Sequence, residues 1–81
     1  MSAVTKTDDD LMRISDDPEL WQSQDGVSDS LRRALLKAAE VSGAGRSPYP
    51  IHGAGGVVIE REQMVRLWHR HGIKPGSRPT A

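Results

Sequence analysis

Apolar and polar side chains follow two different periods along this chain of 81 residues, and each period predicts one kind of element. Over residues 30–42, apolar side chains recur every three or four positions, which places them along one side of a helix. Ser30 is a residue that caps the start of a helix, and Gly43 is a left-handed stop. We therefore expect a helix over residues 30–42 whose buried stripe is Leu31, Ala34, Leu35, Ala38 and Val41.

A second helical pattern begins at residue 60 or 61 and ends at residue 71, because Gly72 and Pro75 stop it. Ile73 follows the stop, where it can pack back on the helix. A period of 3.6 residues divides the helix into two sets of side chains. The set expected to face the core is Met64, Val65, Leu67, Trp68 and His71. The set expected to face the solvent is Glu62, Gln63, Arg66, His69 and Arg70.

Two shorter helical segments are expected in the N-terminal part of the chain. Asp17 and Pro18 form a helix start, because aspartate caps free N–H groups and proline fits the first helical position. The short helix that follows would be anchored by Leu20 and Trp21. The three aspartates at positions 8–10 are placed to cap an earlier single turn of helix.

The segment before the last helix predicts a β-hairpin. Residues 49–52 and 57–59 are expected to be strands, and the glycine-rich residues 53–56 are expected to be the turn between them. Pro50 confines the first strand to a sheet edge, since proline cannot donate a ladder hydrogen bond. Two strands alone are barely stable in water, so the hairpin must lie against the helices.

Together these elements predict a small single α+β domain over residues 8–73, with two or three short helices packed on the hairpin in the order α-α-β-β-α. We expect residues 1–7 to be a disordered arm and residues 74–81 to be a flexible basic tail. Only 36% of the residues are hydrophobic, so the core is small and a homodimer or docked partner would add stability. The expected core is Leu20, Trp21, Leu31, Ala34, Leu35, Ala38, Val41, Ile51, Val57, Ile59, Val65 and Trp68.

Neither composition nor spacing indicates an enzyme. The chain has no cysteine, which removes disulfides and thiolate metal sites. His69 and His71 lie about 200° apart around a helix, so they do not share one metal ion. The serines lie at caps and loops rather than in a nucleophile motif, and no carboxylates are paired. We expect no catalysis, no metal, no cofactor and no small-molecule substrate.

The distribution of apolar residues argues against a membrane location. The longest apolar runs contain only a few residues, whereas a spanning helix needs about 20. The first residues lack the apolar core of a signal peptide. We therefore expect a cytoplasmic protein that does not enter a membrane.

Charge is zero overall but is unevenly distributed. Residues 1–30 carry eight acidic and two basic side chains, whereas residues 31–81 carry three acidic and nine basic ones. Such asymmetry is typical of an acidic arm joined to a half that binds nucleic acid. The alternative is that the two halves neutralise each other within one domain.

The basic half suggests that the chain is a small DNA-binding regulatory protein. Arginine, glutamine and histidine on one helical face can contact base edges and phosphates, and a basic tail can follow the backbone. Against this, Glu62 shares the same face and the isoelectric point is only about 6.8. The side chains expected to contact DNA are Gln63, Arg66, His69, Arg70, Lys74 and Arg78.

The acidic half suggests a different function, that of a protein–protein interaction module in an assembly or an inhibitor. An acidic segment can dock on a basic surface of a partner through complementary charge. The hairpin edge at residues 57–59 can also add a strand from a partner or from a second copy. The side chains expected to dock are Asp8, Asp9, Asp10, Asp16, Asp17 and Glu19.

Overall fold

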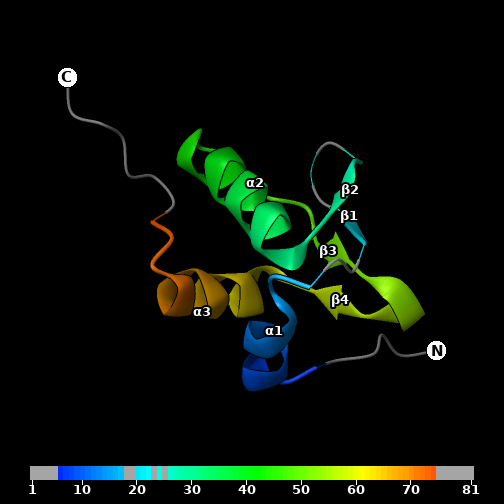
Figure 1. Ribbon diagram of the computed structural model, residues 1–81. Coiled ribbons are helices and arrows are strands. Elements are labelled where there is room, and N and C mark those ends of the chain that lie inside the picture. Colours follow the sequence, from blue (N-terminus) through cyan, green and yellow to red (C-terminus); the bar gives the residue numbers. More distant parts are fainter. Residues whose placement is uncertain (1–5, 18–19, 23, 25, 75–81) are drawn as a thin grey trace.

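The computed structural model of the chain describes residues 6–17, 20–22, 24 and 26–74. Three helices and a four-stranded antiparallel sheet form a small α+β domain, as predicted, with the helices on one side of the molecule and the strands on the other (Figure 1). The elements are α1 (Asp8–Ile14), β1 (Trp21–Gln22), β2 (Ser28–Asp29), α2 (Leu31–Gly43), β3 (Ile51–His52), the 3-10 turn η1 (Ala54–Gly56), β4 (Val58–Ile59) and α3 (Arg61–His71).

The helix α2 confirms the first helical prediction. The Ser30 side chain caps its start by accepting a hydrogen bond from the backbone N–H of Arg33. The helix includes Gly43, the predicted stop, as its last residue, and the left-handed glycine that follows is Gly45. The backbone N–H groups of Ala44 and Arg46 both donate to the carbonyl of Val41, which satisfies a carbonyl of the last turn.

The helix α3 confirms the second helical prediction, including its stop. Gly72 has a φ of 74°, the left-handed conformation that glycine adopts without strain. The backbone N–H of Ile73 donates to the carbonyl of Trp68 at 2.8 Å, which turns the chain back along the helix. Ile73 and Lys74 therefore lie beside the last turn of α3 and do not extend away from it.

The helix α1 is longer than the single turn predicted around the aspartates. Thr7 is its cap, because the threonine side chain accepts a hydrogen bond from the backbone N–H of Asp10. The aspartates thus lie inside the first turn, where the positive end of the helix favours them. Leu11, on the next turn, is fully buried.

The helix predicted after Asp17 is wrong over the residues that the structure describes. Trp21 lies instead in β1, which pairs antiparallel with β2 in the register Trp21↔Asp29. Trp21 is buried as predicted, whereas Leu20 is 67% exposed. Neighbouring residues on opposite faces are the mark of a strand. Pairing that buries the indole therefore outweighs the helix-start signal, part of which, Pro18, lies outside the described residues.

The predicted hairpin is confirmed, but its place in the sheet differs from the prediction. The strands β3 and β4 pair in the register Ile51↔Ile59, and the sheet order is β2-β1-β3-β4. The prediction that Pro50 confines β3 to an edge is wrong, because the proline precedes the paired residues. On the N-terminal side of this proline, the side-chain oxygen of Gln24 accepts from the Tyr49 N–H at 2.7 Å, and the side-chain nitrogen of Gln24 donates to the Tyr49 carbonyl at 2.9 Å. The Gln24 side chain thus continues the contact between the segments that contain β1 and β3.

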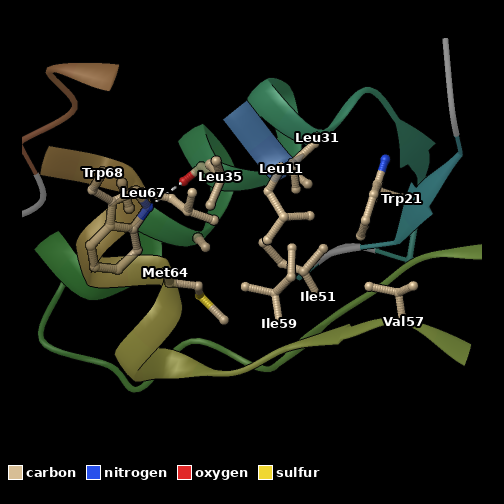
Figure 2. Close-up of a cluster of buried hydrophobic side chains, with 13 residues drawn as sticks. Leu11, Trp21, Leu31, Leu35, Ile51, Val57, Ile59, Met64, Leu67 and Trp68 are labelled. Atoms are coloured by element: carbon tan, nitrogen blue, oxygen red, sulfur yellow. Dashed lines mark hydrogen bonds between the residues drawn. The ribbon is translucent and has the colours of Figure 1, made fainter. Parts of the chain in front are cut away.

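The helices and the sheet enclose one cluster of apolar side chains (Figure 2). The two tryptophans lie at opposite ends of this cluster, and the Trp68 indole N–H donates to the Leu35 carbonyl at 3.0 Å. Two expected core residues are corrected in addition to Leu20: Val65 is 40% exposed, and Val41 is only half-buried. The buried cluster is Leu11, Trp21, Leu31, Ala34, Leu35, Ala38, Ala39, Ile51, Val57, Ile59, Met64, Leu67 and Trp68.

Gly53 makes room for the Trp21 ring at the end of the cluster. A Cβ atom added at Gly53 would lie 2.5 Å from Cζ3 of the indole, closer than any real contact. The φ of Gly53 is −114°, so the backbone itself does not require glycine there. The requirement comes from the aromatic ring alone.

We predict that Gly53→Ala destabilises the fold by about 1 to 3 kcal/mol, as overpacked cores do, and shifts the near-ultraviolet circular dichroism of Trp21. Gly55→Ala in the same turn is the matched control, since its Cβ meets nothing within 4 Å and only its left-handed φ is strained. Urea unfolding measures the stability of both variants. A Gly53→Ala protein with wild-type stability and aromatic signal would contradict the close packing.

Candidate functional site

The two charged surfaces predicted from the sequence meet each other in the folded chain. Arg66 Nε lies 2.8 Å from Asp8 Oδ2, and Arg70 Nη1 lies 2.5 Å from Asp9 Oδ1. The aspartates come from α1 and the arginines from α3, and these two helices are in contact. We call these two ion pairs, together with Gln63, the charged seam. Side chains expected to bind DNA are here held by side chains expected to bind a protein partner.

Gln63 lies at the buried edge of the charged seam. Its side-chain amide donates to the Lys6 carbonyl at 2.7 Å and to Asp8 Oδ1 at 3.0 Å, and the residue is buried. The prediction that Gln63 faces solvent is therefore wrong. The helical period assigned this edge of α3 to water, but α1 packs over it. The burial of Gln63 could have been predicted only if α1 had been predicted as a helix with a buried face.

Further ion pairs join the acidic and basic halves elsewhere. Arg32 at the start of α2 binds Asp16 through two nitrogens, at 2.6 and 3.1 Å, and Arg33 lies 3.5 Å from Asp29. Asp10 instead pairs with Arg13 inside α1. Among the described residues, four ion pairs thus link the first 30 residues to the remainder. The uneven charge along the sequence is largely neutralised within the fold.

Two of the paired carboxylates, those of Asp8 and Asp16, have a lowered pKa. The pKa of Asp8 lies below its usual value, first because Arg66 donates a hydrogen bond to it and second because Gln63 does. Asp16 likewise has a lowered pKa, because Arg32 donates to it. Hydrogen bonds to the charged form favour that form, so these groups remain anionic across the physiological range.

The remaining members of the predicted DNA-binding set lie apart from the seam. His69 and Lys74 line a hollow of about 380 Å³ on the other flank of α3. Arg78 and the predicted docking residue Glu19 lie outside the described residues, and Asp17 is exposed after α1. The structure therefore divides the predicted set between two flanks of one helix. We call the hollow the outer groove; its lining is Val65, Trp68, His69, Gly72, Ile73 and Lys74.

Sequence reasoning missed the outer groove because it assigned Val65 to the core. Val65 lies at the border of the apolar side of α3, next in sequence to buried Met64. The sequence did hold one signal for the groove: Gly72 and Ile73 predict a chain that turns back on the helix. The hollow lies between the segment that turns back at Gly72 and Val65 on the helix.

Ser15 and His71 are in contact where the C-terminal ends of α1 and α3 meet. Ser15 Oγ donates to the Leu11 carbonyl at 2.6 Å and lies 2.9 Å from His71 Nε2. The Ser15 hydroxyl thus bonds both the backbone of α1 and the imidazole at the end of α3. Ser15 is fully buried, so the pair joins two helix ends inside the fold.

The part of the chain that the structure describes contains neither a metal-binding cluster nor a membrane-spanning helix. No group of three or more histidine, aspartate or glutamate side chains is arranged there to hold a metal ion. None of the described helices has the length and apolar character needed to cross a membrane. No family model, curated protein or solved structure matches this chain. The charged seam and the outer groove are therefore interpreted from their own residues.

We predict that Leu11→Ala lowers the free energy of unfolding by about 2 to 5 kcal/mol, as expected for a fully buried leucine, and speeds amide exchange throughout α1. Met12→Ala, a half-buried position on the same helix, is the control and should cost less. Urea unfolding and hydrogen exchange measure both effects. Equal losses in the two variants would show that Leu11 does not anchor α1.

We predict that His71 makes the fold less stable as the pH falls below 6.5. Burial lowers the pKa of His71, and Arg32 lowers it further. The unfolded chain, with a histidine pKa near 6.5, then binds this proton more tightly than the folded chain. The contribution of His71 to folding is therefore complete above pH 6.5 and is lost between pH 6.5 and the folded pKa.

Urea unfolding of the wild type and of His71→Gln across pH 5 to 7.5 measures this effect. The variant should lose the part of the pH dependence that belongs to this imidazole. An NMR titration that places the His71 pKa at or above 6.5 would refute the prediction.

Proposed function

We propose that this chain is a non-enzymatic protein–protein interaction module that works in the cytoplasm and docks through the outer groove of α3. The observation that carries the proposal is an apolar hollow of about 380 Å³ beside an exposed valine, Val65. A hollow lined by apolar side chains offers a place for a side chain of a partner. The other flank of α3 is already occupied by α1.

DNA binding is the less favoured of the two functions suggested by the sequence. Each of the central arginines, Arg66 and Arg70, already holds a carboxylate. Exposed ion pairs are weak, so a phosphate could replace a carboxylate at either arginine. The displaced aspartate would nevertheless stay close to the phosphate and repel it, because buried Leu11 holds α1 in place. The net charge of zero also lacks the basic footprint of a free DNA-binding domain.

The lining of the outer groove supports a binding function over catalysis. It contains one imidazole, His69, and one ammonium group, Lys74, but neither a hydroxyl nucleophile nor a carboxylate. Catalysis generally needs a nucleophile with its base, or an acid paired with a base, at hydrogen-bonding distance. The groove offers an apolar floor and positive charge, which suit recognition.

The proposal predicts position-specific cross-linking in the cells that express the chain. A photoreactive benzoylphenylalanine replaces Val65, and in a matched control it replaces Leu36, an apolar residue of α2 that is 42% exposed. The Val65 position should yield a discrete protein adduct that Lys74→Gln weakens, and the Leu36 position should not.

Either of two results would contradict the docking function. Equal adducts at the two positions, or none at Val65, would remove the groove as a docking surface. Duplex DNA that binds the purified chain with a steep salt dependence, and that loses affinity in Arg66→Gln, would favour the DNA hypothesis instead.

A further inference from the structure

The outer groove is built by the turn that ends α3. The left-handed Gly72 and the hydrogen bond from the Ile73 N–H to the Trp68 carbonyl direct the chain back along the helix. A Cβ at Gly72 would meet nothing within 4 Å, so the groove is open at this point. Ile73, which packs against the core cluster, and Val65 both line the groove.

The floor of the groove is fixed in place. Trp68 is only 3% exposed, and its indole N–H is held by the Leu35 carbonyl (Figure 2). A floor that is anchored in the core does not need to be ordered when a ligand arrives, which lowers the entropy cost of binding. The volume lies near the lower end of the range for ligand sites, and suits one or two side chains of a partner.

The rim of the groove carries one full positive charge, the ammonium group of Lys74. His69 and Lys74 both line it, and none of its lining residues is acidic. Arg70 also lies in the last turn of α3, although it faces the charged seam. A partner segment that places an apolar side chain on the floor would therefore gain from carboxylates on either side of that side chain.

We propose that the outer groove binds an acidic peptide segment of a partner, with one apolar side chain inserted between Val65 and Ile73 and carboxylates beside Lys74 and His69. This inference rests on the proposed docking function and names the chemistry of its partner. A nucleic acid fits the groove less well. Single strands bind by stacking bases on exposed aromatic rings, and the Trp68 ring is almost fully covered.

The test is an amide NMR titration of the intact chain with a synthetic pentapeptide of four glutamates around a central leucine, blocked at both ends. Shifts should concentrate at the residues that line the outer groove. A peptide with serine in place of leucine should bind at least about tenfold more weakly, because it lacks the apolar anchor. A peptide with glutamines in place of the glutamates should also lose affinity, because it lacks the charge. An oligothymidine of equal charge is the nucleic-acid arm.

Two matched pairs of variants locate the site. Lys74→Gln should weaken the peptide about two- to fivefold, whereas Arg13→Gln, which removes the same charge from exposed α1, should not. Val65→Asp should weaken it at least about tenfold, whereas Leu36→Asp should not. The unbound amide spectra of all four variants establish that each one is folded.

Several outcomes would overturn the inference. These are an absence of shifts, shifts centred on the charged seam, equal binding of the serine and leucine peptides, or tighter binding of the oligothymidine. If the Val65 cross-link forms while the peptide fails, the docking function stands and the acidic chemistry is wrong. If both fail, the docking function is wrong as well.

Discussion

The burial of Leu11 is the contact on which the rest of the molecule depends. In Figure 2 this side chain lies in the middle of the cluster, and it comes from a helix of only seven residues. Burying a leucine contributes about 1.5 to 3 kcal/mol, more than exposed ion pairs generally do. The apolar anchor therefore holds α1 against α3, and the charges follow. Once Leu11 is in place, Asp8 and Asp9 reach the arginines of α3 and Ser15 reaches His71.

This arrangement changes what the charge pattern means for function. An acidic half and a basic half suggested two surfaces for two kinds of partner, yet in the fold each surface is bound to the other. The flank of α3 that α1 does not cover carries Val65 and His69, which line a hollow together with Lys74. The binding site that we propose is therefore the outer groove, a mainly apolar hollow beside Lys74, and not the charged seam. The same internal neutralisation explains how a chain with such uneven charge can form one small domain.

Periodicity predicted the elements that are long enough to show it. The helices α2 and α3 and the β3–β4 hairpin followed from spacing, caps and glycine turns. The strands β1 and β2 could not be predicted in this way, because no apolar run marks either of them and the Asp17 signal indicates a helix. Among the candidate site residues, residue type predicted DNA contacts for His69 and Lys74, but the local pattern did not predict their separation from Arg66. Contacts between residues 58 positions apart, as for Asp8 and Arg66, leave no trace in a local pattern.

The central claim is that the acidic and basic halves bind each other, with Arg66 on Asp8, once buried Leu11 holds α1 against α3. A carbon-detected NMR titration of the Asp8 carboxyl, in the wild type and in Arg66→Gln, tests it most directly. The account predicts a wild-type pKa below the usual 3.8, because Arg66 donates to the carboxylate, and a rise in the pKa when the guanidinium is removed. An Asp8 pKa that is ordinary in the wild type and unchanged in Arg66→Gln would contradict the account.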